Sequence, residues 1–265
     1  MKKLKVLALV LAAALACMSL TACGGSSSDN SGSGDASTAG GEEAKTIVVA
    51  TSPDFPPFES LENYEIVGIE VDIMDLIAQD LGMTVKYEQM DFDSVIPGVQ
   101  AGKFDVGMSG ITITEDRQKN CDFTNPYFMA SQAIVVTPDS PITCKADLEG
   151  KKVSVQTGTT AEEYCMDNGY EVLAFTANND AASALTTGKV DAWVVDNEVA
   201  VALAAQQGLT VLDEAMTSEP YAFAFAKGSD ELVQSFNESL QKLMDDGSVQ
   251  KIFDKYGVLY VAPEG

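Results

Sequence analysis

Short apolar segments alternate with segments of helical periodicity from residue 46 onward, and this alternation restricts the possible folds more than any other feature. Residues 46–50 (TIVVA) form a β-branched run of the kind found in buried parallel strands. Apolar side chains then recur at positions 69, 73, 76, 77 and 81, which predicts a helix over 69–81 that Gly82 terminates. We predict a strand at 84–87, a helix at 93–101 and a strand at 106–109. This order predicts a parallel sheet with right-handed crossovers.

The same alternation resumes after residue 131. The segment TTAE (159–162) has the pattern of a capping box and opens a helix. Helices are predicted at 159–168, 178–187, 197–207, 230–245 and 249–256, and strands at 132–137, 153–156, 190–195, 209–212 and 221–226. The chain therefore contains two α/β units. Ligands of such sheets bind beyond the carboxyl ends of the strands.

The first 44 residues have a different character. Lysines at positions 2, 3 and 5 precede an uncharged apolar run at 6–18, which predicts a signal peptide over residues 1–22. The run ends in LTAC (20–23), which resembles a bacterial lipobox, so Cys23 is predicted to carry acyl chains such as palmitate. Ordinary secretory cleavage that leaves a cysteine is the alternative. After Cys23, residues up to 44 are rich in Gly and Ser, which predicts a flexible tether holding the body outside the cytoplasmic membrane.

Composition excludes several function classes. The formal net charge of −24 argues against binding to nucleic acid phosphates. The chain contains no histidine, which removes histidine-based catalytic triads, metal ligands and general bases. The body cysteines, Cys121, Cys144 and Cys165, have no CxxC spacing, which argues against a zinc site and against a thioredoxin-like motif. No metal and no cofactor is predicted. A disulfide between Cys144 and Cys165 is one hypothesis, since exported proteins can form disulfides. Buried reduced thiols are the alternative.

Eight segments together resemble the solute-binding proteins of polar amino acid ABC transporters, bacterial solute-binding protein family 3. They occur in the family's order and cover nearly all of the chain from residue 46. The segments are ATSPDFPPFE (50–59), VGIEVDIMDLIAQDLG (67–82), MDFDSVIPGVQAGKFDVGMSGITITEDRQK (90–119), DFTNPY (122–127), DLEGKKVSVQTGTT (147–160), KVDAWVVDN (189–197), YAFAFAKGSDEL (221–232) and DDGSVQKIFDKYG (245–257).

The resemblance implies an α/β fold of two lobes, the type II periplasmic-binding-protein architecture. Each lobe would be a mostly parallel sheet flanked by helices, with two hinge crossings between the lobes. The implied boundaries are 45–129 plus 222–265 for lobe 1, 133–219 for lobe 2, and 130–132 and 219–222 for the hinges. A ligand would lie in the cleft, over which the lobes close.

The resemblance also implies the residues that bind the ligand. Arg117, the only arginine of the chain, matches the residue that binds the α-carboxylate, a role suited to a planar guanidinium. Asp196 matches the partner of the α-ammonium, although it also precedes a predicted helix and could serve as its N-cap. Further ligand contacts are implied at Gly110 and Thr112, at Thr159 and Thr160 of the helix start, and at the aromatic positions Phe55 and Phe92.

Ser52, Asp54 and Gln156 lie where side-chain specificity is set in the family. Several relatives that prefer cationic amino acids carry Asp at the position of Ser52, so this position departs from theirs. Asp54 offers an acid nearby, and a cationic amino acid, glutamine, a similar neutral polar amino acid and cystine all remain open.

The predicted function is therefore that of the substrate-binding component of an ABC importer, not an enzyme. Its partners would be a small polar amino acid, the membrane permease and the membrane itself through the lipid anchor, and the protein would be a monomer. One alternative is an enzyme resembling cyclohexadienyl dehydratase, which would need a poised acid or base. Another is a receptor sensor module, which would need a transmembrane helix and a signalling domain after residue 265.

Overall fold

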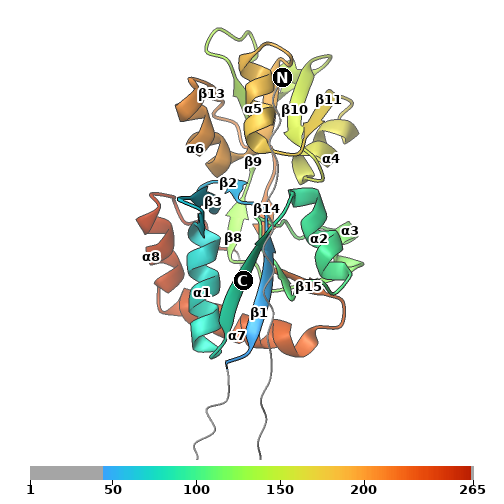
Figure 1. The fold of residues 1–265 in the computed structure, drawn as a ribbon. Coiled ribbons are helices and arrows are strands. Elements are labelled where there is room, and N and C mark those ends of the chain that lie inside the picture. Colours follow the sequence, from blue (N-terminus) through green and yellow to red (C-terminus); the bar gives the residue numbers. More distant parts are fainter. Residues whose placement is uncertain (1–43, 264–265) are drawn as a thin grey trace, which may run out of the picture. The chain divides into compact units, whose positions relative to one another are not determined.

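The computed structural model describes residues 44–263, which belong to one compact unit (Figure 1). The predicted signal peptide, the lipidated Cys23 and the tether up to residue 43 lie outside the described residues. None of the helices in the described part has both the length and the apolar character needed to cross a membrane.

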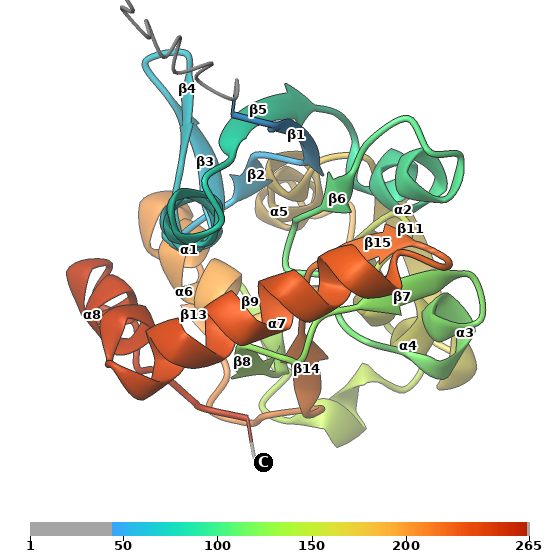
Figure 2. The same ribbon diagram turned by 90° about the horizontal axis from the view of Figure 1, so that it is seen from below.

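The first lobe is built around a five-stranded sheet of order β5-β1-β6-β15-β7. The β-branched run predicts the central strand β1 correctly, and its side chains at Ile47 and Val49 are completely buried. Helices α1 and α8 lie on one side of this sheet and α2 on the other (Figures 1 and 2). The strands are β1 (Thr46–Thr51), β5 (Thr84–Gln89), β6 (Val106–Gly107), β7 (Cys121–Phe123) and β15 (Ala224–Ala226), and the helices are α1 (Ile69–Asp80), α2 (Phe92–Gln100), α3 (Glu115–Gln118), α7 (Asp230–Asp245) and α8 (Ser248–Lys255).

The second lobe repeats this plan around a sheet of order β11-β10-β12-β9-β13. Trp193 of β12 is completely buried, and so is Val155 of β10. The strands are β9 (Gln132–Val136), β10 (Lys152–Gln156), β11 (Glu171–Phe175), β12 (Ala192–Asp196) and β13 (Thr210–Val211), and the helices are α4 (Thr160–Asp167), α5 (Asn178–Thr186), α6 (Asn197–Gln207) and the 3-10 turn η1 (Lys145–Leu148).

In each sheet four strands run in one direction and a single strand, β15 or β9, runs against them. These two strands are the ones that enter a lobe from the other lobe. The connections run through a short antiparallel pair, β8 (Phe128–Ala130) with β14 (Glu219–Tyr221). Gln132 at the start of β9 pairs with Asp196 at the end of β12, and Ala224 of β15 pairs with Gly107 at the end of β6. The carboxyl ends of the parallel strands therefore lie beside the crossing in both lobes.

The two-lobe α/β fold is thus as predicted, with sheets that are mostly parallel. The exact lobe and hinge boundaries stay predictions. The single strand predicted at 221–226 is wrong: the structure has β14 and β15 there, because Tyr221 pairs with Phe128 of the crossing and Ala224 pairs with the first sheet. Elements without a predicted counterpart are α3, η1, β7, β8, β11 and a small antiparallel sheet of β2 (Asp54–Phe55), β3 (Glu59–Glu62) and β4 (Glu65–Val67).

The hypothetical disulfide is also wrong, because all three cysteines among residues 44–263 are free. Cys165 is completely buried in the second lobe's core, beside Val153 and Val155. Cys144 precedes η1 and its Sγ points to Asp147 Oδ2 at 3.6 Å. Burial raises the pKa of the Cys165 thiol to about 12, so this thiol is uncharged at neutral pH.

Candidate functional site

One pocket collects residues that follow strand ends of both lobes. Its lining contains nine of the eleven ligand-contact residues predicted from the sequence, together with Ser109. The nine are Phe55, Phe92, Gly110, Thr112, Arg117, Gln156, Thr159, Thr160 and Asp196. The other two, Ser52 and Asp54, line a neighbouring open cavity of ≈ 720 Å³. No group of three or more His, Cys, Asp or Glu side chains is placed to hold a metal ion among residues 44–263.

Arg117 reaches across the pocket from the first lobe to the second. It lies in α3, which begins where Thr114 Oγ1 accepts a hydrogen bond from the Arg117 backbone N–H at 3.2 Å. Nη1 donates to the Thr112 carbonyl at 2.9 Å and Nη2 donates to the Gly158 carbonyl at 3.1 Å. The guanidinium carbon lies 5.8 Å from the ring centre of Phe92. Burial lowers the pKa of Arg117, but the usual pKa of a guanidinium is so high that the group stays charged at neutral pH.

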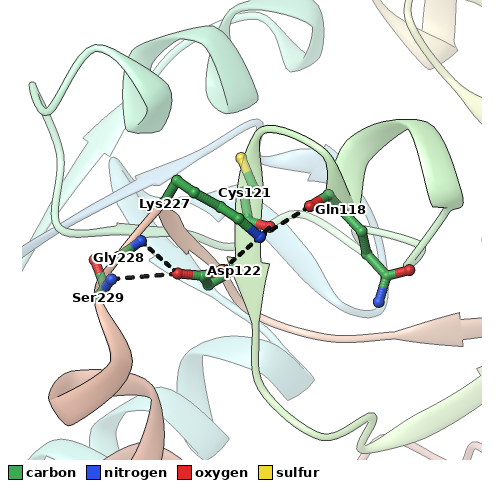
Figure 3. Close-up of polar contacts among 6 residues, drawn as sticks. All are labelled: Gln118, Cys121, Asp122, Lys227, Gly228 and Ser229. Carbon is green, nitrogen blue, oxygen red and sulfur yellow. Dashed lines mark hydrogen bonds and ion pairs between the residues drawn. The ribbon is translucent and has the colours of Figure 1, made fainter.

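A lysine clamp fixes the short helix that carries Arg117 (Figure 3). Lys227 Nζ donates to the carbonyls of Gln118 at 3.0 Å and Cys121 at 3.4 Å, and pairs with Asp122 Oδ1 at 2.8 Å. Asp122 Oδ2 in turn accepts from the backbone N–H groups of residues 228 and 229 at 2.6 and 3.2 Å, just before α7. The end of α3 is thereby tied to the turn between β15 and α7.

Asp196 is the acidic counterpart on the second lobe and is 6% exposed. It is the last residue of β12 and directly precedes α6, but its side chain makes no capping hydrogen bond there. Instead Oδ1 accepts from the Tyr221 hydroxyl at 2.5 Å. Burial raises the pKa of Asp196 to about 7, and the nearby charge of Glu219 is the second cause. The N-cap alternative is therefore wrong for this side chain. It lines the pocket and has no cationic partner within ion-pair distance among residues 44–263.

The two adjacent threonines of the second lobe have different tasks. Thr159 is the N-cap of α4: Oγ1 accepts from the Glu162 N–H at 3.2 Å and donates to the Gln156 carbonyl at 2.7 Å. The capping interpretation thus holds for the Thr159 hydroxyl. Thr160 Oγ1 instead donates to Glu219 Oε2 at 2.6 Å. Both residues line the pocket at the positive end of the α4 dipole, where an anionic group is favoured.

Gly110 and Phe55 pack so closely that only glycine fits. Gly110 has a φ of 53°, and a Cβ atom there would lie 2.4 Å from Phe55 Cε1. The Gly110 N–H donates to Glu70 Oε2 at 2.9 Å. This bond leaves the Gly110 carbonyl as the backbone group that is available to a ligand.

A buried network of acidic side chains supports the turn formed by Ser109 and Gly110, and the sequence analysis did not predict it. Glu59 and Glu70 are both completely buried. Ser109 Oγ donates to Glu59 Oε1 at 2.6 Å, and the Tyr127 hydroxyl donates to Glu70 Oε1. Burial raises the pKa of Glu59 well above its usual value, with the charge of Glu70 as the next cause. A proton held by Glu59 allows the two carboxyl groups to coexist under the Ser109–Gly110 turn.

Asp54 connects the lobes at the outer end of the pocket. Oδ2 accepts from the N–H of Asn178, the first residue of α5, at 2.8 Å, and from Gln156 Nε2 at 3.3 Å. Oδ1 accepts from Ser52 Oγ at 3.1 Å. Asp54 of the first lobe therefore caps a helix of the second lobe. Burial raises the pKa of Asp54, while these hydrogen bonds oppose the rise.

Comparison with known proteins gives three consistent results. The family model described as "Bacterial extracellular solute-binding proteins, family 3" matches residues 47–258. The arginine-binding extracellular protein ArtP of Bacillus subtilis (strain 168) is 32% identical over 256 residues, which is 94% of this chain and 96% of ArtP. An ancestral arginine-binding protein, solved bound to glutamine and bound to arginine, is 41% identical with a TM-score of 0.76, covering 80% of this chain and 97% of that one.

A further solved structure is similar to the same degree. It is an ancestral amino acid-binding protein described as a precursor of cyclohexadienyl dehydratase, and it is 35% identical to this chain. Its TM-score is 0.75, and the match covers 80% of this chain and 95% of the ancestral one.

Proposed function

This chain belongs to the bacterial extracellular solute-binding proteins of family 3, and we propose that it captures a free amino acid between its lobes and delivers it to the permease of an ABC importer. The observation that carries the proposal is the presence of Arg117 and Asp196 in the lining of one pocket. A zwitterion can leave water only where both of its charges meet opposite charges and hydrogen bonds.

Each end of the amino acid has its own set of groups. The Arg117 guanidinium keeps donors beyond those it gives to the carbonyls of Thr112 and Gly158, and we assign these donors to the α-carboxylate. The start of α4 contributes its dipole to the same end. We assign the α-ammonium to Asp196, and the flat faces of Phe55 and Phe92, which are 6% and 8% exposed, to the apolar stem of the ligand.

The far end of the pocket favours a ligand side chain that donates hydrogen bonds. Asn178 Oδ1 is completely buried and has no hydrogen-bond partner among residues 44–263, and Asn178 lines a small pocket together with Gln156 and Asp196. Amide and guanidinium groups supply the N–H donors that such acceptors need. We therefore propose arginine or glutamine as the ligand, in agreement with what the similar proteins are described to bind.

The proposal also states where the protein acts and that it catalyses no reaction. The protein acts outside the cytoplasmic membrane as a monomer held by a lipid on Cys23, and it releases its ligand unchanged. A dehydratase on this fold would convert prephenate or a related acid. Incubation of the purified protein with such acids, followed by chromatography, tests that alternative directly.

A thermal-shift screen of the purified protein against the twenty amino acids and cystine tests the proposed function. A ligand at one hundred times its dissociation constant stabilises the folded state by about 2.7 kcal/mol. For a protein of this size we expect a rise in the melting temperature of about 5–10 °C for arginine or glutamine. Glutamate, whose side chain cannot donate, should give a much smaller rise. The absence of a shift with every compound would contradict the proposal.

The contacts of Asp54 predict that it supports lobe closure for every ligand alike. Asp54→Ala removes the cap of α5 and the bond to Gln156, which we expect to cost about 1 kcal/mol of the closed form, or about fivefold in affinity. Isothermal titration should show the same loss for arginine and for glutamine. Asp139→Ala, which removes an exposed acidic side chain of the second lobe, is the control. A loss confined to arginine would instead make Asp54 a contact of the ligand side chain.

A further inference from the structure

Glu219 is a buried carboxylate at the junction of the two lobes. It lies in the crossing strand β14 and is 5% exposed. Its Oε2 accepts from the hydroxyl groups of Thr112, at 2.8 Å, and of Thr160, at 2.6 Å. Its Oε1 accepts from Thr217 Oγ1 at 2.8 Å. Thr112 follows the first sheet and Thr160 begins α4 of the second lobe, so a single oxygen atom of Glu219 joins both lobes.

These bonds determine what the two threonines can offer to a ligand. A hydroxyl group has one proton to donate and two lone pairs to accept with. Thr112 and Thr160 both give their proton to Glu219, and both line the pocket. Thr160 Oγ1 also lies 3.4 Å from Gln132 Nε2, which takes one of its lone pairs. Toward the pocket, each hydroxyl oxygen can therefore only accept.

An accepting oxygen favours an ammonium group and disfavours a carboxylate. The lone pairs of the Thr112 hydroxyl oxygen thus add to the negative field of Asp196, which lines the same pocket. If Glu219 were an amide, its NH₂ group would donate to one threonine, and that hydroxyl would turn its proton toward the ligand. The chemistry of both threonines depends on the charge state of a residue that does not line the pocket itself.

We propose that Glu219 is a positioning residue that orients the hydroxyl of Thr112 to accept from the α-ammonium of the bound amino acid, while its bond with Thr160 joins the two lobes. This inference rests on the proposed function and assigns one of its determinants. Because both hydroxyls meet the same oxygen only when the lobes are together, Glu219 also couples ammonium recognition to closure.

The test compares an amino acid with its analogue that lacks the α-amino group. Isothermal titration of L-arginine against 5-guanidinopentanoate, and of L-glutamine against glutaramate, measures how strongly the protein selects for the ammonium. We expect Glu219→Gln to weaken binding of the amino acid about tenfold or more and binding of the des-amino analogue by less than about threefold. Glu238→Gln, an exposed residue of α7 changed in the same way, should alter neither value.

Two hydroxyl variants keep the inference testable where Glu219→Gln does not fold. Thr112→Val removes a hydroxyl while preserving shape, and it should reduce the preference for the ammonium about as much as Glu219→Gln does. Thr112→Ser, which keeps the hydroxyl, should restore the preference. In the double variant the two losses should not add, because both act through one bond.

The pH profile supplies a readout that a purely structural role would not move. The groups that face Asp196 are Glu219 and Tyr221 from β14, Glu198 from α6 and Arg117 from α3. Loss of the Glu219 charge should shift the acid limb of amino acid binding to lower pH, because that charge helps to hold the proton on Asp196.

The outcomes separate the two claims. Equal weakening of the amino acid and its analogue, or an unchanged preference in both Glu219→Gln and Thr112→Val, would overturn the role of Glu219 while leaving the proposed function intact. Failure of the unchanged protein to bind any amino acid would overturn the proposed function first.

Discussion

Arg117→Ala should weaken amino acid binding by about 30-fold or more. The ligand carboxylate would enter the closed pocket without a guanidinium, and truncation of one partner of a buried charge pair costs about 2–5 kcal/mol, which corresponds to about 30- to 5000-fold in affinity. The remaining positive field of the α4 start supplies only about 0.3–2 kcal/mol. The same substitution frees the carbonyls of Thr112 and Gly158, so it also weakens the contact between lobes.

Isothermal titration with arginine and glutamine measures this loss, and two further variants sharpen it. Arg117→Lys keeps the charge but lacks the fork that can bond two oxygens, so we expect an intermediate loss of about tenfold or more. Lys103→Ala removes an exposed positive charge of the same lobe and should leave the affinity unchanged. An affinity of Arg117→Ala within about threefold of that of the unchanged protein would contradict the role given to the guanidinium.

The strands and helices that sequence patterns predicted well are those with one strongly apolar face or a buried β-branched run. The helix predicted at 230–245 has those bounds in the structure because Phe236, Leu240 and Leu243 form one buried stripe. The hairpin of β3 and β4 carries the sequence ESLENYEIV and has no such signal. Its register depends on pairing with β2 rather than on a buried face, because Leu61 is 47% exposed.

The binding residues also fall into two groups, those that a sequence motif reveals and those that depend on contacts distant in the sequence. Arg117 and Asp196 are recognisable because they occur in motifs that the family resemblance covers. Glu219 has no local signal, since its partner Thr112 is 107 residues away in the sequence. Asp54 was predicted as a specificity residue, but its bond to the start of α5, which joins residues 124 positions apart, was not predicted. Contacts of this kind arise from the packing of two lobes, and periodicity or spacing within one segment carries no information about them.

The stability of the ligand-free protein should fall as pH rises from about 4 to about 7, with Asp196 as one cause. Its pKa is raised to about 7 in the folded state, above the usual value near 3.9 that the unfolded chain shows. Between these two values the folded state holds the proton and the unfolded state has released it, so folding becomes less favourable as pH rises. Asp196→Asn removes this burden, and we expect it to raise the free energy of unfolding at pH 8 by about 1–4 kcal/mol.

The affinity for the ligand should change in the opposite direction to the stability: it should rise with pH between 5 and 8, and it should fall in Asp196→Asn. The α-ammonium favours the ionised carboxylate, so binding below pH 7 must expel the proton of Asp196, and affinity should fall by up to about tenfold per pH unit as pH drops. Asp196→Asn should lose about a hundredfold in affinity at pH 8 and show a flatter pH profile. Urea unfolding and isothermal titration between pH 5 and pH 8 measure the two effects, with Asp167→Asn, an exposed residue of α4, as the control.

Asp196 combines these two effects because its carboxylate is buried before its partner arrives. The Tyr221 hydroxyl and Gln132 stabilise the ionised form of Asp196, but burial and the charge of Glu219 outweigh them. Part of the binding free energy of the ammonium group is therefore used to ionise Asp196. For this reason Asp196→Asn should stabilise the protein without ligand and destabilise its complex with the ligand. An Asp196→Asn protein that is no more stable than the original at pH 8, or that still binds arginine and glutamine with unchanged affinity, would show that the Asp196 carboxylate does not bind the α-ammonium.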